Sequence, residues 1–350
     1  MKVLIVNPIL YTNENRNIKK VNTIKDTMIY DLCLAFKKKG CDVTLAASDL
    51  YKPSENESYP FNIIWMRTRL TKLFPPHTLP YCPEVKKIAK SGNFDLIITS
   101  EVFSLNSLKL ALCTPKNLIV WQELGKHNRI FHGLASKFWY GIVARSVQAK
   151  EFISKYCKNV SDTIIDHGVN IEKFTPCREK DSQFAISSQL ISRKHIEKSI
   201  EAFAKYLNKY DDSAKLYIMG DGDEKENLRK LAKDLGADKN IIFTGKLGHN
   251  KLIEILKKSI AMLVYTEKDN NMVSIVESIA LATPVITTDV PYNASYIKAE
   301  KLGIVNNNWN EDDLRKLATS DEYINNCINY RKYLPTEYKA EQFLKVKGLI

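Results

Sequence analysis

Short apolar runs alternate with longer amphipathic segments from one end of this 350-residue chain to the other. Runs such as Val3–Val6 and Leu118–Trp121 have the length of strands that are buried on both faces of a sheet. Between the runs lie segments with helical periodicity. One of them, Ile24–Lys39, can begin with a capping box formed by Thr23 and Asp26, and a glycine follows it directly. This alternation predicts an α/β fold with parallel sheets.

The alternation restarts after Cys177–Asp181, a short charged segment that we interpret as an interdomain hinge. The length of the chain also favours two domains. We therefore predict two Rossmann-like, doubly wound domains that face a cleft, at residues 1–178 and 179–325. The polar, amphipathic stretch 326–350 is expected to be helical and to pack back on the first domain. Further helices of the first domain are predicted at Pro83–Lys90, Gly133–Val143 and Gln148–Lys155.

The lack of a recognisable targeting segment and the pattern of cysteines predict a cytoplasmic protein. No run of about 18 apolar residues could form a transmembrane helix. The opening MKVLIVNPIL resembles a short signal peptide but lacks a small-residue cleavage site, so we interpret it as a buried strand. The seven cysteines are odd in number and scattered, with no CxxC pair, which argues against a disulfide framework or a zinc site.

The net charge of +12 is concentrated in the first half of the chain. Residues 1–178 contain 26 Lys and Arg against 15 Asp and Glu, whereas residues 179–350 contain 26 against 25. A basic surface suits nucleic acid, anionic lipid or a phosphorylated substrate. Because no nucleic-acid-binding motif accompanies the charge, we do not expect a nucleic-acid partner. The basic, aromatic segments Trp65–Phe74 and Lys137–Tyr140 are candidates for membrane contact, or else partly buried core with solvated charges.

The most informative segment runs from Tyr265 to Ile286 and predicts a strand, a polar loop, a helix that begins near Ser274, and a further strand. Backbone N–H groups at such a helix N-terminus can bind a diphosphate. Asp269 lies in the loop and Glu277 in the expected first turn of the helix, with seven residues between them. Two carboxylates in these places could bind sugar hydroxyls on either side of the phosphates. Alternatively, the segment is a capped core helix whose glutamate complements the helix dipole.

This segment resembles the acidic-x7-Glu signature of the family 4 retaining glycosyltransferases (glycosyltransferase group 1), which have the GT-B fold. The resemblance implies that Asp269 contacts the donor sugar and that Glu277 binds the ribose of the nucleotide. It also implies that the segment between them holds the donor diphosphate through Asn271, Met272, Val273 and Ser274. The chain departs from the pattern in two places: the first acid is Asp instead of Glu, and Asn270-Asn271-Met272 replaces Gly-Phe-Gly.

A second match lies in Ser187–His195, directly after the first predicted strand of the second domain. The resemblance implies that Lys194 neutralises the leaving diphosphate. Gln189 stands where the family has an arginine. Arg193 can take over that role, because a guanidinium binds phosphate bidentately. The alternative is a solvated basic helix start, although a cation there is unfavourable for the helix dipole unless an anion binds.

Two strand ends of the second domain carry glycines that permit close approach of a ligand. In the family, the corresponding loops line the nucleotide pocket, which adds Gly220, Gly245 and Lys246 to the predicted donor site. Tight turns are the alternative interpretation of both glycines. His167-Gly-Val-Asn170 also matches the family's turn before the hinge, so the resemblance covers residues 162–290.

The first domain is expected to bind the acceptor. Its predicted strand Leu118–Trp121 runs into a polar loop where the family often presents a histidine near the transferred sugar. Glu123 and His127 are therefore candidate catalytic residues, and an exposed histidine beside a structural glutamate is the alternative.

The expected reaction moves a hexose from a nucleotide sugar, taken to be UDP-linked, to a hydroxyl group with retention of configuration. The family's front-face route is preferred, in which the leaving phosphate helps to deprotonate the acceptor. The acceptor would be a carbohydrate or a lipid-linked sugar of bacterial surface polysaccharide or glycolipid synthesis, at the inner face of the membrane. No cofactor or metal is expected, since no Asp-x-Asp motif lies at a plausible strand end.

Two alternative functions stay open, and the sequence disfavours a third. A nucleotide-sugar epimerase of the same fold would turn over the donor without an acceptor. A degenerate sugar-nucleotide-binding protein would explain Gln189 and Asp269. A dinucleotide-dependent oxidoreductase needs a Gly-x-Gly-x-x-Gly loop after its first strand, and Asn7–Thr12 contains no glycine.

Overall fold

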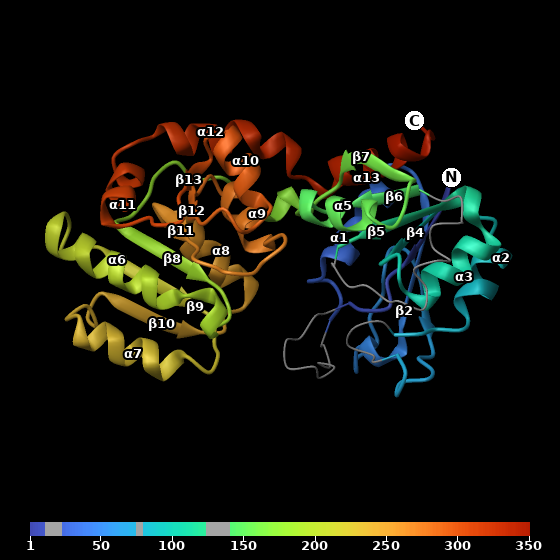
Figure 1. Ribbon diagram of the computed structural model, residues 1–350, viewed down its shortest axis with the longest axis horizontal. Helices are drawn as coiled ribbons and strands as arrows, with labels where there is room; N and C mark the ends of the chain where they lie inside the picture. The colour runs from blue at the N-terminus through green and yellow to red at the C-terminus, as the bar shows by residue number, and fades with distance from the viewer. Residues whose placement is uncertain (11–22, 75–79, 124–140) are drawn as a thin grey trace. The chain divides into compact units, whose positions relative to one another are not determined.

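The computed structural model describes residues 1–10, 23–74, 80–123 and 141–350 (Figure 1). His127, the segment Lys137–Tyr140 and most of the predicted helix at Gly133–Val143 lie outside the described residues. The chain forms two compact units: unit 1 comprises Met1–Gly168 and Thr336–Ile350, and unit 2 comprises Val169–Pro335. Within the described residues, none of the helices combines the length and the apolar character needed to span a lipid bilayer.

Unit 1 is a seven-stranded parallel sheet with the strand order β3-β2-β1-β4-β5-β6-β7. Its strands are β1 (Lys2–Val6), β2 (Asp42–Ser48), β3 (Asn62–Met66), β4 (Leu96–Ser100), β5 (Leu118–Gln122), β6 (Gly141–Ala144) and β7 (Val160–Ile164). Its helices are α1 (Met28–Lys38), α2 (Val85–Ser91), α3 (Leu105–Cys113), α5 (Val147–Ser154) and α13 (Thr336–Lys347).

Alternate residues of β1 enter two separate cores. Val3 and Ile5 pack in one cluster with Phe36 of α1 and with residues of α13. Leu4 and Val6 pack in the other cluster, together with residues of α2 and α3. Because successive side chains of a strand point to opposite faces, helices cover both faces of the sheet. Unit 1 is therefore doubly wound, as the continuous apolar runs predicted.

Unit 2 is a six-stranded parallel sheet with the strand order β10-β9-β8-β11-β12-β13. Its strands are β8 (Gln183–Ser187), β9 (Lys215–Met219), β10 (Ile241–Gly245), β11 (Ala261–Leu263), β12 (Val285–Thr287) and β13 (Gly303–Val305). Its helices are α6 (Ile196–Lys209), α7 (Lys225–Asp234), α8 (His249–Lys258), α9 (Val273–Ala280), α10 (Asn293–Ala299), α11 (Glu311–Ala318) and α12 (Glu322–Tyr330). The predicted α/β class with two parallel sheets is confirmed.

The boundary between the units differs from the expected one at residue 178. The segment that we interpreted as a hinge, Cys177–Asp181, lies inside unit 2. Phe174, before it, is buried in a core of unit 2, and Lys180 Nζ donates hydrogen bonds to Lys257 O and Thr283 Oγ1, both at 2.9 Å. A charged segment can thus pack within a domain when its polar atoms form hydrogen bonds. A run of charged residues alone therefore did not predict the boundary between the units.

The return of the chain to unit 1 begins later than residue 326. Helix α12 belongs to unit 2, and only Thr336–Ile350 joins unit 1. There α13 packs against α1. Lys38, the last residue of α1, forms an ion pair with Glu337, and Lys39, which follows it, forms one with Glu341, both at 2.8 Å.

Two local predictions in unit 1 are wrong. Helix α1 begins at Met28 with Thr27 as its N-cap, because the Thr27 hydroxyl accepts a hydrogen bond from the Tyr30 N–H at 3.2 Å. The capping box at Thr23 and Asp26 is therefore not the start of the helix. In addition, Gly141–Ala144 forms the strand β6 instead of the end of a helix. Its apolar residues are buried between β5 and β7, which outweighs the helical pattern read from the preceding residues.

Candidate functional site

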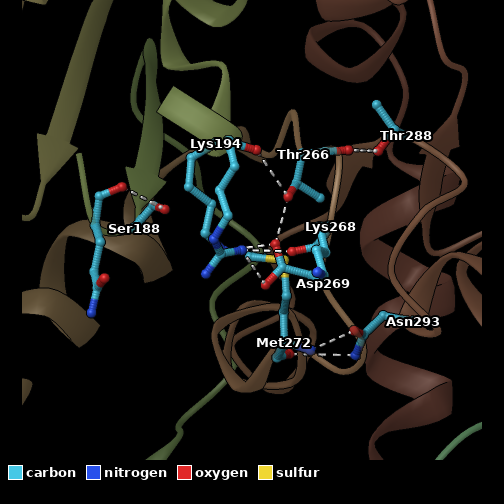
Figure 2. Close-up of polar contacts among 10 residues, drawn as sticks. Ser188, Lys194, Thr266, Lys268, Asp269, Met272, Thr288 and Asn293 are labelled. Atoms are coloured by element: carbon cyan, nitrogen blue, oxygen red, sulfur yellow. Dashed lines mark hydrogen bonds and ion pairs between the residues drawn. The ribbon is translucent and has the colours of Figure 1, made fainter. Parts of the chain in front are cut away.

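The strand order of unit 2 reverses between β8 and β11. In open parallel sheets, ligands bind at the carboxyl ends of strands, at the point where the order reverses. The loops that follow β8 and β11 contain the two segments singled out in the sequence, and the structure brings them together (Figure 2). The predicted donor residues of both loops therefore share one edge of the sheet.

Asp269 is the centre of this cluster. Its carboxylate accepts hydrogen bonds from Lys194 Nζ at 2.7 Å, from Thr266 Oγ1 at 2.5 Å and from Arg193 Nη1 at 3.3 Å. Figure 2 shows Lys194, Thr266 and Asp269 pointing toward one another. The Lys194 side chain is only 11% exposed and that of Asp269 15%, so the pair is shielded from most of the solvent. The lysine retains two further N–H donors, since an ammonium group has three.

The backbone that carries these cations is held in an uncommon conformation. Arg193 and Lys194 lie in a single 3-10 turn, and the next residue, His195, has a left-handed φ of 39°. His195 pairs with Glu197 at 2.7 Å and with Glu267 at 2.6 Å. The hydrogen bond to Glu197 raises the pKa of His195, and the contact with Glu267 raises it further. Burial lowers this pKa but does not outweigh the two carboxylates. Left-handed non-glycine residues concentrate at functional sites, so His195 adds to the predicted cluster.

A buried asparagine that the sequence analysis missed shapes the loop before α9. Asn293 is fully buried, and its Oδ1 accepts a hydrogen bond from the Met272 N–H at 2.7 Å. Its Nδ2 donates to Asn271 Oδ1 at 2.8 Å. Figure 2 shows Asn293 directed at Met272. The family's glycines are absent from this loop, and a side-chain amide fixes its backbone instead.

Helix α9 begins at Val273, and among the described residues no side chain caps its N-terminus. The first N–H groups of a helix have no partner within the helix, so Val273 and Ser274 can offer them to an anion. Glu277 is the fifth residue of α9, so it lies in the second turn and not in the first turn as expected. Its carboxylate receives a hydrogen bond from His249 Nε2 at 3.0 Å.

The glycine loops have a structural reason as well as a predicted functional one. A Cβ atom on Gly220, whose φ is 154°, would lie 1.8 Å from Ser188 O. This glycine lets the loop after β9 approach the loop after β8, which carries Lys194. Gly245 has a φ of 68° with open space around it, and Lys246 beside it is exposed. The donor-binding roles of these three residues stay predictions.

Unit 1 contains a second cluster of charged side chains, at the carboxyl end of its sheet. Glu123, just after β5, pairs with Arg145 Nη1 at 2.7 Å and with His167 Nε2 at 3.4 Å. Arg145 follows β6, is 4% exposed, and its guanidinium lies 3.5 Å from the centre of the Trp121 ring. Nearby, Gln122 Nε2 donates to the buried Glu101 at 2.8 Å.

These contacts limit the chemistry of Glu123. Burial raises the pKa of its carboxyl, but the charge of Arg145 and the hydrogen bond from His167 outweigh burial and lower the pKa to about 2. A general acid or base works best with a pKa near the operating pH. Glu123 therefore suits a fixed negative charge or an acceptor for substrate hydroxyls, and does not suit proton transfer at neutral pH.

Glu123→Gln is expected to lower the free energy of unfolding by about 1–3 kcal/mol at pH 7, because it removes the ionic partner of the buried Arg145. The folded-state pKa of Glu123 is below its ordinary value of 4.5. Its contribution is therefore complete above about pH 4.5 and is lost as the pH falls toward 2. Urea denaturation of both proteins between pH 7 and pH 3 measures this difference.

Asp162→Asn is the control, because Asp162 is fully exposed and pairs with Lys150 at the surface. A surface pair contributes little, so this variant should match the wild type. Equal stability of Glu123→Gln and wild type at pH 7, or a difference that persists unchanged at pH 3, would contradict the assignment.

In comparisons with known proteins, the family match falls on unit 2. Residues 170–332 match the family model of the glycosyl transferases group 1. Over 179 residues the chain is 26% identical to the alpha-monoglucosyldiacylglycerol synthase of Streptococcus pneumoniae, a match that covers 47% of this chain and 40% of that protein. The matched part thus spans less than half of that relative's length.

Solved structures match the fold over the whole chain. A glycosyltransferase from Rickettsia africae superposes with a TM-score of 0.73 at 15% identity, covering 99% of this chain and 98% of that one. HepE of Anabaena in complex with UDP-glucose superposes with a TM-score of 0.64 at 12% identity, over the full length of both chains. At such identities the likeness concerns the fold alone, and it confirms the expected GT-B class.

Proposed function

We propose that the chain, whose residues 170–332 match the family model of the glycosyl transferases group 1, transfers a sugar from a nucleotide-sugar donor to a hydroxyl group of an acceptor. The observation that carries the proposal is the cluster of Lys194, Arg193 and Asp269 where the strand order of unit 2 reverses. The cluster lies on the loops that precede α6 and α9, and α9 offers N–H groups to an anion.

The charges suit the departure of a nucleoside diphosphate. Cleavage of the bond from the sugar to the phosphate leaves negative charge on the phosphate oxygens and positive charge on the sugar ring. Lys194 and Arg193 stabilise the phosphate, and prearranged donors of this kind are a large term in catalysis. Asp269 orients the donor sugar while it keeps Lys194 in place, and Glu277 binds the ribose. With this positive charge at the leaving group, the proposed reaction includes no metal ion.

The finer assignments are also proposals. HepE of Anabaena, solved with UDP-glucose, supports a UDP-linked hexose as the donor. The alpha-monoglucosyldiacylglycerol synthase of Streptococcus pneumoniae supports a lipid acceptor and a glycolipid product, and the poly(ribitol-phosphate) alpha-N-acetylglucosaminyltransferase of Staphylococcus aureus supports a surface polymer as the second candidate acceptor. The family resemblance supports retention of configuration by a front-face route. Glu123, whose ionised carboxylate suits hydroxyl binding better than proton transfer, is assigned to acceptor binding.

A lipid-linked acceptor requires unit 1 to approach a membrane. Leu70 and Leu73 are 55% and 74% exposed, and Arg67, Arg69 and Lys72 beside them are exposed as well. Exposed leucines flanked by cations suit an anionic bilayer surface. We expect the protein to co-sediment with phosphatidylglycerol vesicles at low salt and to be released at 1 M salt. Equal sedimentation with neutral vesicles would contradict the charge-based part of this proposal.

The donor site can be tested without knowledge of the acceptor. The melting temperature is measured with UDP, UDP-glucose, UDP-N-acetylglucosamine, GDP-mannose and ADP-glucose. A ligand at 100 times its Kd should add about 2.7 kcal/mol to the stability of the folded state, which one member of the panel is expected to do. No shift with any nucleotide would contradict the proposal. Conversion of a bound donor without an acceptor would instead indicate an epimerase.

A further inference from the structure

His249 contacts Glu277 but belongs to no motif found in the sequence. It is the first residue of α8, after the loop that follows β10, and its Nε2 lies 3.0 Å from Glu277 Oε1. The Glu277 side chain is 15% exposed and that of His249 is 36% exposed. Among the described residues, His249 supplies the one side-chain partner of this carboxylate.

The imidazole is itself held by packing. Its ring meets that of Phe174 edge to face, with centroids 5.8 Å apart and an interplanar angle of 77°. Phe174 is 2% exposed, and its carbonyl oxygen accepts a hydrogen bond from Arg331 Nη1 at 2.8 Å. A fixed aromatic wall therefore sets the orientation of the ring, and the ring directs one N–H to Glu277. Glu277 alone, as a long side chain, would have several rotamers to lose on binding a ligand.

We infer that His249 is a positioning residue that fixes the Glu277 carboxylate for the ribose hydroxyls, and thereby sets the selectivity of the site for ribonucleotides. The inference rests on the proposed function. One carboxylate oxygen accepts the imidazole N–H, which leaves the other oxygen to accept from a ribose hydroxyl. Partners that orient a binding group in this way raise the affinity for the ligand, because less conformational entropy is lost on binding.

The selectivity is measured as the ratio of Kd values for 2′,3′-dideoxy-UDP and UDP, obtained by isothermal titration. A hydrogen bond from a ribose hydroxyl to a charged group predicts a ratio of about 10 or more for the wild type. Glu277→Ala should reduce the ratio to about 1, because the charged acceptor is gone. If UDP does not bind, the same comparison is made with ADP or GDP and the corresponding 2′,3′-dideoxynucleotide.

Two variants of His249 separate positioning from packing. His249→Phe keeps an aromatic ring against Phe174 but cannot donate a hydrogen bond, and we expect its ratio to fall at least threefold. His249→Gln loses the ring but can donate through its amide, and we expect it to retain most of the wild-type ratio. In both variants the affinity for the dideoxy nucleotide should stay near that of the wild type. Asn250→Ala, an exposed neighbour on α8, is the control and should leave the ratio unchanged.

A wild-type ratio in His249→Phe overturns the inference and leaves the proposed function intact. A ratio that falls in His249→Gln but not in His249→Phe assigns packing as the role of His249 and also overturns the inference. Failure of the wild type to bind any of the nucleoside diphosphates overturns the proposed function, and the inference with it.

Discussion

Replacement of Lys194 by alanine is expected to lower kcat for sugar transfer by about 100- to 1,000-fold, the loss typical when one prearranged donor to a developing negative charge is removed. Lys194 is 11% exposed and already directed at the site by Asp269, so its ammonium group needs little rearrangement as the diphosphate departs. The KM for the donor should change less than kcat, because Arg193 and the N-terminus of α9 still bind the diphosphate before the reaction.

Lys198→Ala is the matched control for this variant. Lys198 lies in the first turn of α6, four residues after Lys194, is 50% exposed and pairs with Glu201 at the surface. It should leave kcat unchanged, since a surface pair contributes at most about 1 kcal/mol and Lys198 does not contact Asp269. Steady-state release of nucleoside diphosphate, together with a melting curve for each protein, provides the measurement. Full activity in a folded Lys194→Ala protein would remove the leaving-group role.

Replacement of Glu277 by alanine is expected to raise the KM for the donor by about 10- to 100-fold, the equivalent of hydrogen bonds to a charged acceptor. The ribose is remote from the bond that breaks, so the binding energy lost is mainly that of the ground state. kcat should therefore fall by a smaller factor than kcat/KM. Glu277→Gln should lie between the wild type and the alanine variant, since an amide oxygen still accepts a hydrogen bond without the charge.

Glu254→Ala is the control for Glu277, because Glu254 is a largely exposed carboxylate on α8 that pairs with Lys257. The donor is titrated at saturating acceptor for each protein, which separates KM from kcat. A Glu277→Ala protein with unchanged KM would show that this carboxylate does not bind the nucleotide. A fall in kcat alone would move Glu277 from ribose binding to the reacting centre.

The sequence predicts unit 2 well because its elements are strongly periodic. Helix α9 begins at Val273, within one residue of the predicted start near Ser274. Lys194 and Asp269 were selected through the family resemblance. Both lie in loops that follow apolar runs, and the ends of parallel strands share one edge of a sheet. Their direct contact across 75 residues could not be predicted, because it depends on β8 and β11 being neighbours.

The missed residues of this site share a physical explanation. Asn293 and His249 lie 21 and 28 residues from the positions they contact, Met272 and Glu277, and neither stands in a recognisable local pattern. The amide of Asn293 and the imidazole of His249 have partners that only the tertiary structure brings near them. Asparagine is also common at helix starts, where α10 begins with Asn293, so its position in the sequence has an ordinary explanation.

In unit 1, one wrong element hid the charged cluster. The predicted helix Gly133–Val143 left no strand at β6, so Arg145 was not recognised as a residue at a strand end. Glu123 follows the apolar run Leu118–Trp121, which was predicted correctly as the strand β5. A charged or polar residue directly after each successive strand was the available signal, and it would have placed Arg145 opposite Glu123 once β6 was assigned.

The central claim, transfer of a sugar from a nucleotide donor to a separate acceptor, is tested most directly by the dependence of nucleoside diphosphate release on the acceptor. Donor and protein are incubated with and without a diacylglycerol or glycolipid acceptor in anionic vesicles, and released nucleotide and new glycoside are both quantified. The account predicts release that requires the acceptor, equals the glycoside formed and is lost in Lys194→Ala. Donor turnover at the same rate without any acceptor, or tight donor binding with no turnover under either condition, would contradict it.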